Sequence, residues 1–180
     1  MDKKILLATA LLAAALLAAC GGDEPVGAPP AVPPAADDTR AAAPGPAAVW
    51  AEAFTPAADA LAAGHCALDA INGGSPQAVA LPATGSALFG GWVADAALQV
   101  PADALFVLRG ATASFAAPLS AGSTQRPDVA QALGSEALAG AGFDLLLALD
   151  GLPAGSYELS AVVDRATQAT CSFNATLVIQ

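Results

Sequence analysis

Three cysteines are the residues of this chain best suited to chemistry, and they stand in different surroundings. Cys20 ends an apolar N-terminal stretch, whereas Cys66 and Cys171 lie in segments where apolar and polar residues alternate. Neither of these two belongs to a Cys-x-x-Cys motif, and His65 is the only histidine of the chain, which makes a poor ligand set for zinc. We therefore predict a Cys66–Cys171 disulfide, with a redox-active or metal-binding pair as the alternative.

The sequence lacks the motifs of common enzymes. It has no Gly-x-Ser-x-Gly, no His-Glu-x-x-His and, after Lys4, no lysine that would complete a phosphate-binding loop. Its 16 acidic residues do not by their number identify the positioned pair that glycosidase chemistry needs. We expect no catalytic residue, no metal ion and no cofactor. A small hydrolase that uses loop carboxylates is the alternative.

A few polar and aromatic residues are candidates for binding. They are Asn72, Trp92, Asp95, Arg126 and Asp128. Arg126 would donate to an anionic or hydroxyl-rich ligand and Trp92 would stack on it, in a shallow site formed by an inserted helix and neighbouring loops. The alternative is structural, with Trp92 as a core residue and Arg126 and Asp128 as a local ion pair and helix cap.

Short alternating or apolar stretches, separated by turn-forming residues, must position these side chains. We predict strands at 65–71, 88–95, 104–109, 143–149, 157–163 and 170–179, and a hairpin connection over the turn-rich residues 150–156. Pro127, Asp128 and Gly134 predict a short helix over 125–134, to which residues 135–138 can add a turn. The pattern is typical of a mostly β protein, an antiparallel β-sandwich over 65–180 with one or two short inserted helices.

The first 19 residues have the layout of an export signal. Lys3 and Lys4 precede an apolar stretch from Ile5 to Ala19, which ends in small residues before Cys20. The stretch is about 15 residues long, shorter than the roughly 20 that a membrane-spanning helix needs, so we predict a cleaved signal peptide over 1–19. Export also favours oxidation of the cysteine pair.

Leu17-Ala18-Ala19-Cys20 resembles the lipobox of bacterial lipoproteins at all four positions. The resemblance implies that the Cys20 thiol receives a diacylglyceryl group, that the chain is cut before Cys20, and that the new amino terminus is acylated. These acyl chains would anchor the protein in a lipid bilayer. Gly21 stands where an aspartate retains some lipoproteins in the inner membrane, which implies an outer-membrane location facing the periplasm. Ordinary secretion with cleavage near Ala19, which leaves Cys20 as a free thiol, is the alternative.

Residues 20–46 consist largely of Gly, Pro, Ala and Asp and show no apolar periodicity. Such a segment cannot bury enough apolar surface to fold, so we predict a disordered tether, with a proline-rich recognition peptide as the alternative. Over residues 47–64 we expect one or two short helices. Trp50 and Phe54 are spaced for one helical face, Thr55-Pro56 is typical of a helix start, and Gly64 of a helix end.

The charge balance argues against one class of partner. The 180-residue chain has 6 basic residues and a net charge of -10, and removal of Lys3 and Lys4 with the signal leaves it still poorer in bases. Nucleic-acid binding needs a basic surface, so we expect none. Hydrophobic residues make up 56% of the chain but aromatic ones only 5%, because alanine dominates, and the core must therefore rest on few large side chains.

Five short motifs together resemble an immunoglobulin-like β-sandwich module of bacterial envelope proteins, one that is appended to glycosyltransferases and other surface proteins. The motifs are Ile71-Asn72-Gly73, Gly91-Trp92 with Asp95, Arg126-Pro127-Asp128-Val129, Ala141-Gly142-Phe143 and Leu152-Pro153-Ala154-Gly155-Ser156-Tyr157. The resemblance covers 66–180 and implies a non-catalytic accessory or binding module for another envelope protein or glycan, although no enzyme domain accompanies it here. A purely structural spacer is a further alternative.

Overall fold

Alternating apolar and polar residues form eight strands in the part of the chain that the structure, a computed structural model, describes. That part comprises Trp50, Thr55, Ala60 and residues 62–180. The predicted signal peptide and tether lie outside the described residues. No helix within the described residues is long and apolar enough to cross a membrane.

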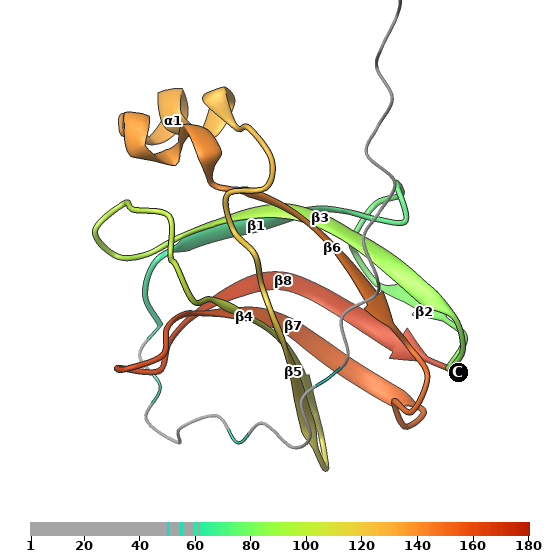
Figure 1. The fold of residues 1–180 in the computed structure, drawn as a ribbon. Helices are drawn as coiled ribbons and strands as arrows, with labels where there is room; N and C mark the ends of the chain where they lie inside the picture. The colour runs from blue at the N-terminus through green and yellow to red at the C-terminus, as the bar shows by residue number, and fades with distance from the viewer. Residues whose placement is uncertain (1–49, 51–54, 56–59, 61) are drawn as a thin grey trace, which may run out of the picture. The chain divides into compact units, whose positions relative to one another are not determined.

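The strands and the two short helices between them follow one another along the chain (Figure 1). The elements are β1 (His65–Ile71), β2 (Val79–Leu81), β3 (Ser86–Ala94), β4 (Leu105–Gly110), β5 (Ser114–Pro118), helix α1 (Pro127–Leu133), the 3-10 helix η1 (Glu136–Gly140), β6 (Gly142–Ala148), β7 (Gly155–Asp164) and β8 (Ala169–Ile179). All six predicted strands are present, with ends within two residues of their predicted positions. The short strands β2 and β5 were not predicted.

The strands form two sheets, an arrangement consistent with the predicted β-sandwich. The first sheet has the order β1-β3-β6 and the second the order β2-β8-β7-β4-β5. Neighbouring strands are antiparallel except β2, which pairs in parallel with β8. The prediction of a mostly β fold is confirmed, with this one parallel pair as the exception to its antiparallel order.

The predicted hairpin over residues 150–156 is wrong. β6 belongs to the three-stranded sheet and β7 to the five-stranded sheet, so the connection between them crosses from one sheet to the other. Alternation in a sequence shows which residues face the core, but it does not identify the neighbouring strand, and two consecutive strands with turn residues between them fit either arrangement.

One hydrophobic core fills the space between the two sheets, and phenylalanine supplies its largest side chains. The ring of Phe106 lies 5.0 Å from that of Phe89 and 5.5 Å from that of Phe173, measured between centroids. Phe143 borders the same group, 6.4 Å from Phe106. Half of the remaining buried residues of this core lie in β6, β7 and β8.

The predicted disulfide is confirmed. Cys66 in β1 and Cys171 in β8 are bonded, with an S–S distance of 2.01 Å and a sequence separation of 105 residues. Because β1 and β8 belong to different sheets, the bond joins the two layers as well as the two ends of the domain. It therefore closes a long loop around the hydrophobic core between the sheets.

Residues before β1 also contact the domain. The Trp50 side chain is partly buried against the main core, and its indole Nε1 donates to the carbonyl oxygen of Ala148 in β6. Ala62 forms a parallel β-bridge with Thr170, whose carbonyl accepts the N–H of Ala63 at 2.8 Å. The described residues within 47–64 adopt no helix, and the rest of that predicted helical lead-in lies outside the described residues.

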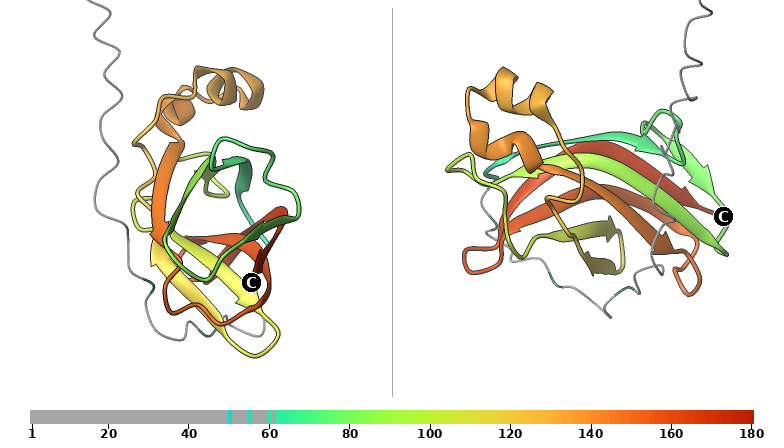
Figure 2. Two further views of the ribbon diagram at one scale, coloured as in Figure 1. Left: turned by 90° about the vertical axis from the view of Figure 1, so that its right-hand side faces the viewer. Right: turned by 45° about the horizontal axis from the view of Figure 1, so that its top comes forward.

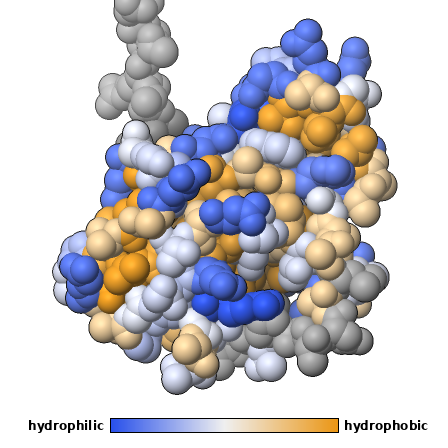
Figure 3. Space-filling view, turned by 180° about the vertical axis from the view of Figure 1, so that it is seen from behind, coloured by the Kyte–Doolittle hydropathy of each residue, from blue (hydrophilic) through white to orange (hydrophobic). Residues whose placement is uncertain are grey.

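The insert, defined here as α1 and η1, packs on the outer face of the three-stranded sheet (Figures 1 and 2). As predicted, α1 has Pro127 at its start, Asp128 in its first turn, and Gly134 in the left-handed conformation at its end. A second, small core holds the insert on the sheet; its buried members are Ala94, Val129, Leu138 and Ala141. Seen from behind, apolar residues also gather on the surface of the insert (Figure 3).

Candidate functional site

Arg126 and Asp128, the predicted ion pair, form the centre of a three-residue cluster beside the insert. The Arg126 guanidinium donates through Nε and Nη2 to the two carboxylate oxygens of Asp128, at 3.0 and 2.8 Å, and through Nη1 to Asp69 Oδ2 at 2.6 Å. The hydrogen bonds between Arg126 and Asp128 hold the pKa of Asp128 at about 2 and raise that of Arg126.

The cluster links α1 to the three-stranded sheet, because Asp69 lies in β1. Arg126 is the least exposed member, at 17% against 49% for Asp69 and 65% for Asp128. The sequence did not single out Asp69, which becomes a partner only when β1 passes beside residue 126. Because the Arg126 guanidinium donates to Asp128 in α1 and to Asp69 in β1, Arg126 holds the helix against the sheet. The predicted helix cap is not formed by a side-chain hydrogen bond.

Asn72 lies at a turn, away from the other candidates. Asn72 and Gly73 both have positive φ angles, 51° and 75°, and the flanking residues Ile71 and Gly74 exchange two backbone hydrogen bonds. This is the geometry of a two-residue hairpin turn, for which Asn-Gly is strongly preferred. The Asn72 side-chain oxygen accepts the N–H of Leu88 at 2.8 Å, so the residue ties the turn to β3.

Trp92 lies on the outer face of the three-stranded sheet and is half-buried against the small core beneath the insert. Its neighbours in the sheet are Ala67 in β1 and Gly142 in β6. A side chain at Gly142 would collide with Thr124 and Arg126, so Arg126 covers the residue that pairs with Trp92 in the sheet. The ring is thus a packing residue of the insert and lies outside the main core.

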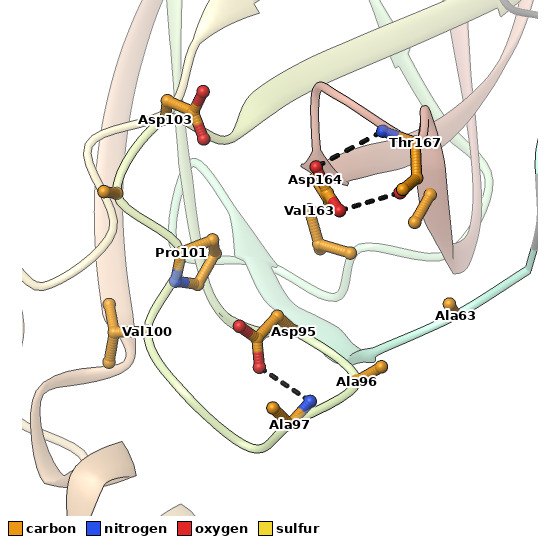
Figure 4. Close-up of a pocket in the computed structure, with 12 residues that line it drawn as sticks. Ala63, Asp95, Ala96, Ala97, Val100, Pro101, Asp103, Val163, Asp164 and Thr167 are labelled. Carbon is orange, nitrogen blue, oxygen red and sulfur yellow. Dashed lines mark hydrogen bonds between the residues drawn. The ribbon is translucent and has the colours of Figure 1, made fainter.

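Asp95 lies at a cavity of about 520 Å³, between the β3–β4 loop and the β7–β8 turn (Figure 4). The volume is within the range of small-ligand pockets. Asp95 Oδ1 accepts the N–H groups of Ala97 and Gln99, at 2.9 and 2.8 Å, and thereby shapes the β3–β4 loop. Of the candidate residues, Asp95 is the one that lines this cavity.

The β7–β8 turn forms the opposite wall. Asp164 accepts the Thr167 hydroxyl and the Ala166 N–H, both at 2.8 Å, and these hydrogen bonds, the one from Thr167 first, lower the pKa of Asp164. Arg165 links the two walls, because its Nε donates to the backbone carbonyl of Asp103 at 2.7 Å. The Asp103 carboxylate lies 3.9 Å from the same nitrogen.

The cavity combines an apolar lining with acidic residues. Its apolar side chains include Val100, Pro101, Val163 and Ala169, and its acids are Asp95, Asp103 and Asp164. Sequence reasoning missed Asp103 and Asp164. Asp103 stands in the loop before β4 and Asp164 is the last residue of β7. Only the strand order could have shown that these two positions meet at one end of the domain.

A second hollow, of about 600 Å³, lies along the insert between Pro127 and Ala139. It is lined mainly by small side chains and carries Glu136. Neither hollow has the donors of a metal site, since no three His, Cys, Asp or Glu side chains among the described residues are grouped to hold an ion. The cavity at the loops, defined here as the loop-end cavity, carries three acidic residues against one in the second hollow and is therefore taken as the candidate site.

Comparison with known proteins adds no functional assignment, since no protein family, curated protein or solved structure matches this chain.

Proposed function

We propose that this protein is a lipid-anchored, non-catalytic module of the bacterial cell envelope that binds another envelope protein or a glycan at its loop-end cavity. The cavity carries the proposal, because it is a concave site built from two loops on a rigid scaffold. Cys20 supplies the anchor through acylation, and residues 21–46 form the tether that holds the domain off the outer membrane, facing the periplasm.

The strand order supports an immunoglobulin-like domain. In such domains the strands A, B and E share one sheet and C, F and G the other. When β1, β3, β4, β6, β7 and β8 are lettered A, B, C, E, F and G, the order β1-β3-β6 becomes A-B-E and the order β8-β7-β4 becomes G-F-C. The short strand β2 then takes the place of a second part of strand A, beside strand G. The insert occupies the position of strand D, between β5 and β6.

Tyr157 supports the same assignment. Its hydroxyl donates to the carbonyl oxygen of Pro153 at 2.7 Å, four residues upstream, and its ring is buried. Immunoglobulin-like domains place a tyrosine near the start of strand F that bonds back to the backbone in this way. Here Tyr157 lies near the start of β7, which is strand F in the lettering above.

This lettering gives the loop-end cavity a functional precedent. The β3–β4 loop becomes the B–C loop and the β7–β8 turn becomes the F–G loop. In antibody variable domains these two loops lie at the end of the sandwich that binds antigen. The parallel is one of architecture and does not identify a ligand.

The alternative, a small hydrolase that uses loop carboxylates, has weaker support. A general acid needs a carboxyl group whose pKa is raised toward neutrality. The pKa of Asp164 is lowered instead, by hydrogen bonds from Thr167 and from the turn. This carboxylate therefore stays charged and suits binding better than proton donation.

A photo-crosslinking amino acid at the cavity tests the binding role in living cells. We expect the full chain with the crosslinker at Ala97 or Ala102 to capture one envelope component. The same crosslinker at Ala154, in the exposed β6–β7 connection away from the cavity, should not capture it. Equal capture at all three positions, or none at the cavity, would reject the proposal.

Anchoring is tested separately. Globomycin should cause a larger precursor to accumulate, and labelled palmitate should enter the unaltered chain but not Cys20→Ser, whose disulfide should stay intact. Labelling of Cys20→Ser to the same extent as the unaltered chain, or no labelling of either, would refute anchoring through an acylated Cys20.

A further inference from the structure

We infer that the loop-end cavity receives a lysine or arginine side chain of a partner protein. The inference rests on the proposed binding function and names the chemical class of the ligand. A basic side chain has a long apolar stem and a charged end, so a site for it needs an apolar lining for the stem and carboxylates for the head. The cavity offers both.

The apolar lining comes from strands of the five-stranded sheet and from the loop that faces them. Val163 lies near the end of β7, Ala169 begins β8, and Val100 and Pro101 belong to the β3–β4 loop. Val163 and Ala169 are buried members of the main core, so this part of the wall is anchored in the rigid part of the domain. A methylene stem that packs there is removed from water, and the protein loses little conformational entropy because this part of the wall is already ordered.

The carboxylates favour a positive ligand. Asp95 and Asp164 come from facing loops, and Asp103 lies beside them (Figure 4). Among the residues that line the cavity there is no lysine or arginine. The neighbouring Arg165 donates to the backbone carbonyl of Asp103 and also forms an ion pair with the Asp103 carboxylate, at 3.9 Å. A cation entering the cavity is therefore attracted chiefly by Asp95 and Asp164, which form no ion pair within the described residues.

The site is also pre-organised. Asp95 Oδ1 accepts two N–H groups of its own loop, and Asp164 accepts three hydrogen bonds from its turn. These contacts fix the backbone around the acids before any ligand arrives. Binding then orders fewer groups, which improves affinity for a given contact area.

The lining favours a protein partner over a glycan. Sugar rings are commonly held by aromatic side chains that stack on their faces, and none of the residues that line the cavity is aromatic. Trp92, the tryptophan in the strand that leads into the loop, packs beneath the insert instead. The alanines and valines of the cavity fit an alkyl stem.

The test is an NMR titration of the 15N-labelled full chain with a capped five-residue peptide, a lysine flanked by alanines. We expect saturable shifts of the amide signals of Ala97, Ala102 and Thr167. The same peptide with norleucine in place of lysine keeps the stem and lacks the charge, and should bind at least about tenfold more weakly.

The variant Asp95→Asn/Asp103→Asn/Asp164→Asn removes the three charges and keeps a side-chain oxygen at each position. The retained amide oxygens at positions 95 and 164 can still accept the N–H groups of their loops, so the loops should keep their shape. We expect this variant to bind the lysine peptide at least about tenfold more weakly than the unaltered chain.

The matched control is Asp144→Asn/Asp150→Asn/Glu158→Gln, which changes the net charge by the same amount at positions outside the cavity. We expect it to weaken binding less than about twofold, because exposed charges beyond the screening length contribute little. Equal weakening by both triple variants would overturn the proposal, since the attraction would then be a general effect of net charge.

Two other results would also overturn it. If the norleucine peptide binds as tightly as the lysine peptide, the cavity selects the stem and not the charge. If a glucosamine oligosaccharide shifts the cavity amides and the lysine peptide does not, the ligand is a glycan. In either case the crosslinking at Ala97 and Ala102 can still succeed, so the binding function is judged separately from the ligand class.

Discussion

Removing the disulfide should cost this domain a large share of its stability. Cys66→Ala/Cys171→Ala opens a loop whose ends are 105 residues apart. In the chain-entropy treatment, closing a loop of that length stabilises the folded state by about 4.7 kcal/mol at 25 °C. The free energy of unfolding of a domain of this size is roughly 5 to 15 kcal/mol, so the loss amounts to between a third and nearly all of the stability.

Urea unfolding followed by tryptophan fluorescence measures this loss, because Trp50 and Trp92 both pack on the folded domain. With a slope of about 2 kcal/mol per molar urea, the midpoint should fall by about 2 M. The Cys20→Ser variant is the matched control and should leave the midpoint unchanged. A fall of less than about 0.5 M, or two free thiols in the denatured, unreduced Cys20→Ser chain, would refute the reasoning.

Three single contacts lead to further predictions. Tyr157→Phe removes the hydroxyl that bonds to the β6–β7 connection and should lower the free energy of unfolding by about 1 kcal/mol in urea titrations; an unchanged midpoint would contradict this. Gly91→Ala places a methyl group against the β1 backbone and the Phe143 ring, and should cost about 1 to 3 kcal/mol, whereas a neutral effect would mean that β1 can shift. Arg126 holds the pKa of Asp128 at about 2, below its ordinary 3.8, so this ion pair stabilises the fold above about pH 4 and is lost as the pH falls toward 2. The melting temperature of Asp128→Asn should therefore decline less than that of the unaltered chain over this interval, and parallel declines would show that the pair contributes nothing.

The alternation of apolar and polar residues along the sequence made much of the fold predictable. Rows such as Phe143, Leu145 and Leu147 have a period of two residues, which matches the geometry of a strand with one buried face. Pro127 and Gly134 marked the ends of the short helix for equally local reasons, since each residue type suits the backbone at one end of a helix. These features depend on neighbours a few residues apart.

The candidate site was predictable only in part. Asp95 does line the loop-end cavity, and Arg126 and Asp128 do form an ion pair. Asp103 and Asp164 could not be paired with Asp95, because the loops that carry them meet only through the order of the strands. For the same reason, nothing in the sequence joined Asp69 to Arg126.

The order of the residues thus determined six strands, the inserted helix and the pairing of two cysteines. Strands and helix ends depend on residues a few positions apart, and the disulfide followed from the scarcity of other partners for the two cysteines. Which strands are neighbours became known from the folded chain alone. The fold separates β6 from β7, sets β2 parallel to β8, and brings two distant loops together around one cavity. The physical reason is that a strand's pattern fixes the face it buries, whereas its backbone hydrogen bonds can be made with any partner.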